Sequence, residues 1–151
     1  MIKGQFLFYG SDLSDVLRIR EQVFLEEQKA EQSMVWNEDD QTAAHLIIYD
    51  GTKPVATGRL VKEEDGYKIG RIAVCKDERG KEYGDFVVRI LLERAFQCQG
   101  DKVKVTAQLH AVPFYERYGF QKSGEEYCSE GLMCVDMSVK KENCNFGCQC
   151  H

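Results

Sequence analysis

The sequence is poor in proline and tryptophan, and it has no long apolar run. Two prolines and one tryptophan occur among its 151 residues. No stretch approaches the ~20 apolar residues that a membrane span requires. The first residues, MIKGQFLFYGSD, lack the apolar segment and the small-residue cleavage site of a signal peptide. No internal repeat or Pro/Gly/Ser-rich linker divides the chain. These absences predict one cytoplasmic domain that does not bind a membrane.

The chain also lacks an excess of positive charge. It has 20 Lys and Arg against 25 Asp and Glu, which gives a net charge of −5 and a pI of about 5.3. Domains that bind nucleic acid usually carry a basic patch, so this balance argues against such a partner. Acidic residues are dense between positions 21 and 40. We expect either a solvated face there or the mouth of a site that attracts a cationic substrate.

The remaining composition, 43% hydrophobic and 30% charged, is typical of a globular protein. Apolar periodicity predicts the order β-α-β-β-β-α-β-α-β-β. Asp-Gly pairs separate three strand-like runs within 43–74, which predicts an antiparallel meander. The elements expected around it are a strand at 4–10, a helix within 11–28, a helix of about fifteen residues that starts near Lys81, a strand at 103–109, a short helix ending at Gly119, and strands at 120–128 and 131–139. The order predicts an α/β fold with a mixed, mostly antiparallel sheet flanked by helices, and a right-handed parallel crossover into 103–109.

Glycine and positive charge gather where the longer helix should begin. The stretch KDERGKEYG carries Arg79 and Lys81 beside Gly80 and Gly84. A helix N-terminus offers unpaired N–H groups and the positive end of the helix dipole. The pattern therefore favours a pyrophosphate site, although an ordinary turn with a solvated cap is the alternative. It matches neither a Walker loop nor a G-x-G-x-x-G fingerprint.

The segment AQLHAVPFYERYGF places a tyrosine on the short helix that follows a strand. Tyr115 is either a core ring or a general acid whose O–H faces a leaving group. His45 and His110 are expected to be hydrogen-bonded structural histidines rather than bases, and His45 has the stronger functional case.

These segments together resemble the GNAT superfamily of N-acetyltransferases, and within it the ElaA-like branch. Arg79 and Gly84 match the ends of the superfamily's anion loop, R/Q-x-x-G-x-G/A. The branch motif R-x-x-V-F-x-x-E-Q falls on Arg20, Val23, Phe24, Glu27 and Gln28, and its acidic pair and histidine fall on Asp39, Asp40 and His45. Its Ala-Gln pair and F-Y-x-x-x-G-F fall on Ala107, Gln108, Phe114, Tyr115, Gly119 and Phe120. The matches span about residues 18–137 in the right order.

The resemblance implies an acyl-CoA N-acyltransferase domain over residues 1–140 that transfers an acetyl group from acetyl-CoA to a primary amine by direct attack. The implied acceptor is a small-molecule or peptide amine, no metal is implied, and a homodimer is left open. The backbone of Ile72 to Val74 would pair with the pantetheine arm, and the N–H groups from Arg79 to Gly84 would hold the pyrophosphate. The implied cofactor contacts are Ile72, Ala73, Val74, Arg79, Gly80, Lys81, Glu82, Tyr83, Gly84, Gln108 and Phe114. Tyr115 would protonate the departing thiolate, and the implied substrate contacts are Arg20, Phe24, Glu27, Gln28, His45 and Cys134.

Two positions depart from the family pattern. Glu82 stands where the anion loop has its middle glycine. Its side chain is expected to point into solvent, and a positive φ there would cost roughly 1 kcal/mol. Cys134 stands where the branch reads a histidine in D-G-I-x-H. These departures leave open an alternative, an acyl-CoA sensor that has kept the pocket and lost catalysis.

Seven cysteines occur in the chain. Cys75, Cys98, Cys128 and Cys134 fall in expected core elements and are predicted to be buried free thiols of a reducing compartment. The ending CNFGCQCH holds Cys144, Cys148, Cys150 and His151. Its spacing is cramped for tetrahedral zinc, so residues 141–151 are expected to form a flexible or oxidisable tail, with a zinc site as the alternative.

Overall fold

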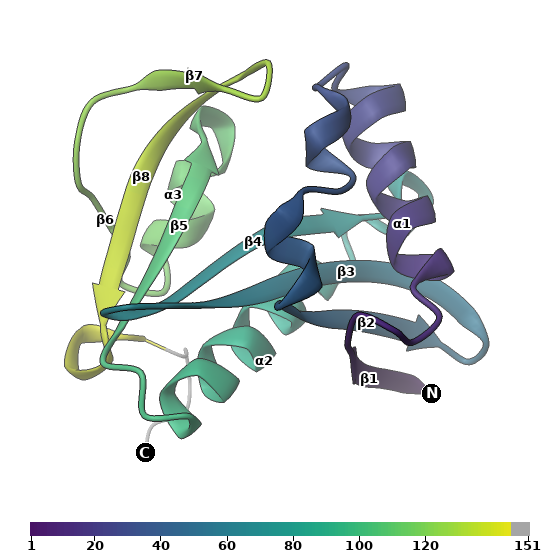
Figure 1. Cartoon of the computed structure of the whole chain (residues 1–151), viewed down its shortest axis with the longest axis horizontal. Helices are drawn as coiled ribbons and strands as arrows, with labels where there is room; N and C mark the ends of the chain where they lie inside the picture. Colours follow the sequence, from purple (N-terminus) through teal and green to yellow (C-terminus); the bar gives the residue numbers. More distant parts are fainter. Residues whose placement is uncertain (146–151) are drawn as a thin grey trace.

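The computed structural model describes residues 1–145, which form one eight-stranded sheet with helices on both faces (Figure 1). The strand order is β1-β2-β3-β4-β5-β8-β6, and β7 pairs with β8. The strands are β1 (Ile2–Leu7), β2 (Ala44–Asp50), β3 (Lys53–Glu63), β4 (Gly66–Val74), β5 (Lys102–Gln108), β6 (Gln121–Lys122), β7 (Tyr127–Ser129) and β8 (Leu132–Lys140). The longer helices are α1 (Ser14–Arg20), its π-helical continuation η1 (Glu21–Glu27), α2 (Tyr83–Gln97) and α3 (Val112–Glu116). Short 3-10 turns are η2 (Gln32–Met34), η3 (Glu38–Gln41), η4 (Lys76–Glu78), η5 (Leu109–Ala111) and η6 (Lys141–Asn143).

The predicted order of elements is confirmed, with two local differences. The first helix begins at Ser14 and changes from α to π geometry after Arg20. The strand expected at 120–128 is split into β6 and β7, because the exposed stretch SGEE interrupts it and Gly124 adopts a φ of 144°. Such a left-handed conformation suits glycine and breaks a regular strand.

The central strands are apolar on both faces because helices cover both. Leu46 and Ile48 of β2 belong to the core cluster that α2 packs against, whereas Ile47 between them belongs to the cluster under α1. Successive side chains of a strand point to opposite faces, which explains the unbroken apolar run in β2. Gly58 of β3 allows α2 to approach closely, since a Cβ there would lie 2.6 Å from Cγ1 of Val87.

β4 pairs with β3 along its length but with β5 over only part of it. The register with β3 shifts opposite Thr57–Arg59, where Arg71 adopts a φ of 52°. A bulge of this kind bends the strand and increases its twist. The pairing with β5 is parallel, as predicted, and covers only Tyr67–Ile69. The two strands then diverge (Figure 1), and within residues 1–145 the edge of β4 from Gly70 to Val74 has no strand partner on that side.

A buried ionic network, which we term the Asp40 cluster, lies between α1, η3, β2 and β3. Arg20 Nη1 and Arg59 Nη1 both donate to Asp40 Oδ1, at 3.1 and 3.0 Å. Nε2 of His45 donates to the Asp40 carbonyl (3.0 Å), and Nδ1 accepts from Arg20 Nη2 (3.2 Å). Burial lowers the pKa of His45. His45 is therefore a neutral, hydrogen-bonded structural histidine, the expected form.

Two of the four cysteines predicted to be buried are exposed. Cys134 is buried and Cys75 is half-buried, but Cys98 and Cys128 are exposed free thiols. Cys98 caps the C-terminal end of α2, beyond its apolar face, and Cys128 lies on β7, which pairs with β8 at the margin of the sheet. The prediction was wrong there because apolar periodicity does not show where an element meets solvent.

The first part of the expected tail packs on the domain. Asn145 N–H donates to the Tyr118 carbonyl at 2.9 Å, and Cys144 packs against the main core, where burial raises the pKa of its thiol to about 11. Gly119, with a φ of 97°, permits this contact, because a Cβ there would lie 2.4 Å from the Asn143 carbonyl oxygen. Residues 141–145 are thus part of the packed domain, whereas Cys148, Cys150 and His151 lie outside the described residues.

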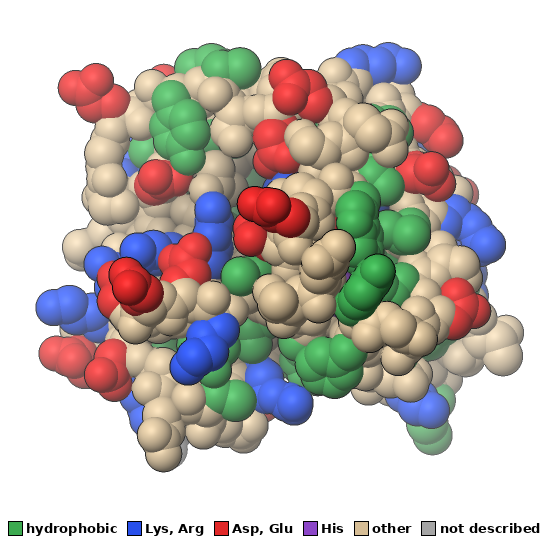
Figure 2. Space-filling view, viewed as in Figure 1, with side chains coloured by type: hydrophobic (Ala, Val, Ile, Leu, Met, Phe, Trp, Pro, Cys, Tyr) green, Lys and Arg blue, Asp and Glu red, His purple; other side chains and the backbone are tan. Residues whose placement is uncertain are grey.

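The surface carries charges of both signs. On the face shown in Figure 2, Lys and Arg side chains are interspersed with Asp and Glu rather than gathered into a patch. Between residues 1 and 145, none of the helices has both the length and the apolar character that crossing a bilayer requires.

The Asp40 cluster predicts a large stability effect. Asp40→Asn leaves Arg20 and Arg59 buried beside an uncharged amide, so we expect the free energy of unfolding to fall by about 3–5 kcal/mol. Chemical denaturation measures this free energy. The control is the exposed neighbour, Asp39→Asn, which should stay within about 0.5 kcal/mol of the parent.

Burial raises the pKa of Asp40, but Arg20, the Asn37 N–H and Arg59 together bring it below its usual 3.8. The stabilisation is therefore complete above pH ~4 and lost as pH falls through the lower, folded-state pKa. Equal stability of the Asp40→Asn and Asp39→Asn variants would contradict this stabilising role of Asp40.

Candidate active site

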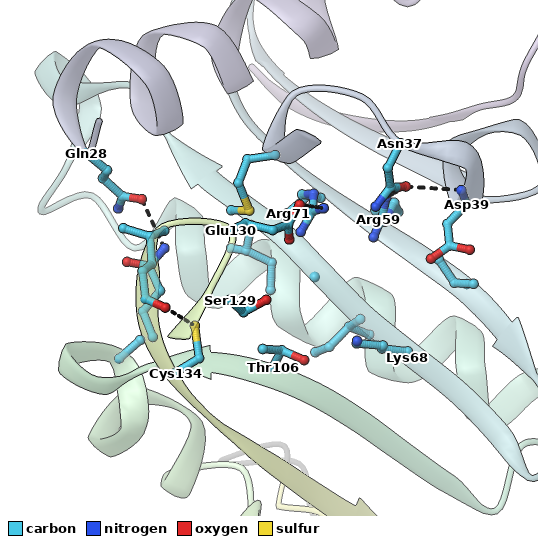
Figure 3. A pocket seen from close by; sticks show the side chains of 18 of the residues that line it. Gln28, Asn37, Asp39, Arg59, Lys68, Arg71, Thr106, Ser129, Glu130 and Cys134 are labelled. Carbon is cyan, nitrogen blue, oxygen red and sulfur yellow. Dashed lines mark hydrogen bonds and ion pairs between the residues drawn. The ribbon is translucent and has the colours of Figure 1, made fainter. Parts of the chain in front are cut away.

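Two cavities lie along the unpaired edge of β4. The first, of about 200 Å³, occupies the divergence of β4 and β5 and is lined by side chains of β3, β4, β5, the segment 28–39 and the β7–β8 turn (Figure 3). The second, of about 300 Å³, lies at the start of α2. Ile72 lines the first cavity and Val74 lines the second. The free edge of β4 therefore runs from one cavity to the other.

The loop that precedes α2 presents backbone N–H groups at the second cavity. Among residues 1–145, the N–H groups from Gly80 to Asp85 have no hydrogen-bond partner. Gly80 has a φ of 85° and Glu82 a φ of 65°, while the Glu82 side chain is exposed. The expected solvent-facing Glu82 is confirmed, and the left-handed backbone that a glycine would favour is present. The concavity suits an anion, because helix-terminal N–H groups point into it.

Carboxylates hold the two basic side chains of this loop. Arg79 Nη1 and Nη2 donate to the Glu27 carboxylate at 2.8 and 2.7 Å, and Arg79 Nε donates to the Val74 carbonyl at 3.1 Å. Lys81 Nζ lies 3.0 Å from Glu78. Ion pairing offsets both positive charges, so the backbone N–H groups are the main donors that the loop presents. Glu27 also accounts for part of the acidic density noted between positions 21 and 40.

Contacts between distant segments bridge the divergence of β4 and β5. The Gln108 side chain on β5 donates to the Gln28 side chain at 3.0 Å. Arg71 Nη2 on β4 donates to Glu130 in the β7–β8 turn at 3.0 Å (Figure 3). The same atom donates to the Ser33 carbonyl at 3.2 Å. These contacts tie the segment after η1 to both diverging halves of the sheet and fix the width of the cavity.

Two protonated groups line the first cavity. Tyr115 of α3 is 7% exposed, its ring packs edge-on against Phe114 and Phe120, and burial raises its pKa above 10. Cys134 of β8 donates to the Leu132 carbonyl at 3.5 Å, and burial raises the pKa of its thiol. Each group keeps its proton near neutral pH and can act as a donor. His110 is exposed and borders the same cavity.

The expected substrate residues divide into two groups. Gln28 and Cys134 line the first cavity, and Glu27 holds Arg79 beside the second. Arg20, Phe24 and His45 are at most 2% exposed and line neither cavity, because they belong to the Asp40 cluster or to the core under α1. Side chains buried in this way cannot contact a substrate in this structure. Among the expected cofactor residues, the Ala73 side chain also faces the α1 core, which leaves only its backbone at the edge.

Several residues of the first cavity were not predicted, namely Arg59, Lys68, Arg71 and Glu130. The sequence does hold a signal for the two arginines. Each follows a glycine inside an apolar strand, in VATGRLV and IGRIAV. A charged residue is rarely buried unless it is paired, so an arginine in such a run indicates a buried partner or a site.

The sequence matches the family model described as an acetyltransferase (GNAT) domain over residues 12–141. It is 33% identical over 127 residues to the uncharacterized N-acetyltransferase YjcF of Bacillus subtilis, covering 83% of this chain and 90% of YjcF. It is 30% identical over 148 residues to the protein ElaA of Escherichia coli, covering 91% and 96%. The crystal structure of E. coli ElaA aligns with a TM-score of 0.82 at 27% identity, covering 91% of this chain and 99% of that chain. The chain therefore belongs to the GNAT family of acetyltransferases and has the acyl-CoA N-acyltransferase fold.

Proposed function

We propose that this enzyme transfers the acetyl group of acetyl-CoA to a primary amine by direct attack of the neutral amine on the thioester carbon. The observation that supports this most is the free edge of β4, which joins the cavity between β4 and β5 to the N–H groups at the start of α2. We place the reaction in the cytoplasm, with a small-molecule or peptide amine as the acceptor.

The residues along β4 and the α2 loop fit the donor. Backbone groups from Ile72 to Val74, except the Val74 carbonyl that Arg79 occupies, offer hydrogen bonds to the amides of a pantetheine arm. The N–H groups from Gly80 to Asp85 offer them to a pyrophosphate. A Cβ on Gly84 would lie 3.7 Å from both Phe114 Cζ and Val74 Cγ2, so a side chain there would fill the concavity. Bound acetyl-CoA supplies the activated acyl group.

The side chains of the first cavity can move the protons that this reaction requires. As the new C–N bond forms and the C–S bond breaks, Tyr115 donates its proton to the departing sulfur. The carboxylates of Asp39 and Glu130 line the same cavity and, through water, accept the proton that the amine loses. The Tyr115 hydroxyl keeps its proton at neutral pH, as a donor must, although burial raises its pKa and so makes it a weaker acid.

An acyl-CoA sensor is the alternative function. Glu82 places a carboxylate beside the anion site, and Cys134 provides a neutral thiol where the resemblance expects a histidine. A sensor would bind acetyl-CoA and release no thiol with any amine. An enzyme would release CoA in proportion to the amine that it acetylates.

The Tyr115→Phe variant tests the proposed acid. The ring and its packing remain and only the hydroxyl is lost. We expect kcat to fall by roughly 10–10³-fold, because general acid catalysis typically contributes about 10²–10⁴-fold and a thiolate with a pKa near ~8.5 needs only moderate help. KM for acetyl-CoA should change little. Tyr127→Phe is the matched control, since the Tyr127 hydroxyl binds Asp136 and does not line the cavity. A Tyr115→Phe enzyme with parental kcat and a lower Tm would show that Tyr115 is only a core residue.

Two variants at Glu82 separate charge from backbone strain. Glu82→Gln removes the negative charge and keeps the left-handed residue, so CoA should bind a few-fold more tightly. Glu82→Gly should bind CoA at least as tightly as Glu82→Gln and also gain roughly 1 kcal/mol in free energy of unfolding, because glycine adopts a φ of 65° without strain. Calorimetric titration with CoA and chemical denaturation measure the two effects. Weaker CoA binding by both variants would assign Glu82 a positive role in the site.

Arg79 and its partner form a further pair of variants. Arg79→Ala should weaken CoA binding by about tenfold, because a hydrogen bond to a charged group contributes about 1.5–3 kcal/mol. Glu27→Gln removes the competing carboxylate and leaves Arg79 free for phosphate, so CoA binding should be retained or tightened. If both variants lose CoA equally, the ion pair itself, and not the arginine charge, shapes the loop.

A further inference from the structure

One end of the first cavity is basic, and the acetyl transfer proposed above assigns no role to the cations there. Arg59 of β3 and Lys68 and Arg71 of β4 line the cavity, and Figure 3 shows Arg59 and Lys68 toward the end opposite Gln28 and Cys134. We propose that this basic end binds a carboxylate or phosphate of the acceptor, so that the acceptor is an amine that also carries an acidic group. This inference rests on the proposed function and names its substrate class.

The two arginines keep donors available after their structural contacts are made. The Arg59 side chain is 6% exposed, and its Nη1 is used by Asn37 and Asp40. Arg71 uses Nη2 for Glu130 and the Ser33 carbonyl. Within residues 1–145, Arg59 Nη2 and Arg71 Nη1 make no hydrogen bond and are not among the fully buried atoms, whereas both Nε atoms are buried without a partner. The planar guanidinium fork matches the geometry of a carboxylate or a phosphate.

Lys68 adds a third cation with no carboxylate of its own. Its side chain is half-buried at the cavity, and no carboxylate in residues 1–145 forms an ion pair with it. Lys104 on the neighbouring strand differs, because it pairs with Glu63 and Asp65 and does not line the first cavity. An unpaired ammonium beside two arginines favours an anion from outside the chain.

The charges around this end do not cancel. The cations that line the first cavity are Arg59, Arg71 and Lys68, and the carboxylates that line it are Asp39 and Glu130. Behind them, buried Arg20 pairs with buried Asp40. Asp40 is shared between two arginines, Glu130 is held by Arg71, and Asp39 lies exposed at the rim. One positive charge remains in excess. A simple alkylammonium ion gains nothing from this field, whereas an amino acid or an aminoalkyl phosphate can place its anion there and direct its amine toward Tyr115.

Binding of acetylated products tests this subsite without requiring turnover. The probes are N-acetylglycine, N-acetyl-β-alanine, 4-acetamidobutyrate and N-acetylphosphoethanolamine, compared with the neutral N-propylacetamide in an NMR titration of the protein. We expect at least one anionic product to bind about tenfold or more tightly than the neutral one, since each charge-assisted hydrogen bond contributes a tenfold or larger effect. The carboxylates and the phosphate probe distinguish the two kinds of anion.

A matched pair of variants locates the effect. Lys68→Met should reduce the preference for the anionic probe by about tenfold and leave binding of the neutral probe unchanged. Lys104→Met removes a lysine outside the first cavity, so the preference should stay at the parental value. Equal binding of anionic and neutral probes, no detectable binding of any anionic probe at millimolar concentration, or the same preference in Lys68→Met as in the parent each overturns the proposal.

CoA release with free amines tests the proposed function separately. Glycine, β-alanine, 4-aminobutyrate and phosphoethanolamine are compared with propylamine as acceptors. Anionic probes that bind while no amine releases CoA would retain the subsite and reject the transferase function. If CoA is released at least as fast with propylamine as with the acidic amines, the transferase function is retained and the anion subsite is rejected.

Discussion

The site depends on the early end of the parallel pairing between β4 and β5. Three residue pairs join the strands, from Tyr67 with Val103 to Ile69 with Val105, and the strands then separate. Backbone N–H and C=O groups at a strand edge need partners, and a sheet edge accepts an added extended chain. The bulge at Arg71 bends β4 at the same place. One local irregularity thus provides both the free edge and the adjoining cavity.

The polar residues that carry the family resemblance serve mainly to hold this opening in shape. Arg20 and His45 complete a hydrogen-bonded network around Asp40, although the Nε atoms of Arg20 and Arg59 remain buried without a partner. Gln28 binds a side chain on β5. A shared polar motif is easily interpreted as a set of substrate contacts. In this chain, most residues of the shared polar motif are structural, and they position the few side chains that can reach a ligand.

Local signals in the sequence were sufficient for most of the architecture. The pair Asp50-Gly51 indicated one hairpin and Asp65-Gly66 the next, and the apolar period from Tyr83 indicated α2, because hairpins and amphipathic helices are determined by neighbouring residues. The left-handed backbone at Glu82 could be anticipated because a family motif has glycine at that position. These features require no knowledge of which distant segments meet.

The basic part of the cavity could not be predicted in the same way. Arg59 is held by Asn37, 22 residues away, and Arg71 by Glu130, 59 residues away. From the sequence, each is a single charge within a strand, and its burial depends on loops whose paths no periodic pattern specifies. The exposure of Cys98 and the split between β6 and β7 are unpredictable for a related reason, since the first depends on where α2 meets solvent and the second on where the sheet ends.

The amide pair between Gln28 and Gln108 joins residues 80 positions apart in the chain. Contacts between such distant segments form slowly, because the entropy of closing a long loop must be overcome before the contact contributes. We therefore expect the cleft to be among the last parts of the molecule to assemble during folding, after the meander and α2 have formed. A ligand that requires the completed cleft binds only the native state, so it shifts the folding equilibrium toward that state by mass action. Recovery of ligand binding is therefore a stricter test of complete refolding than recovery of helix content.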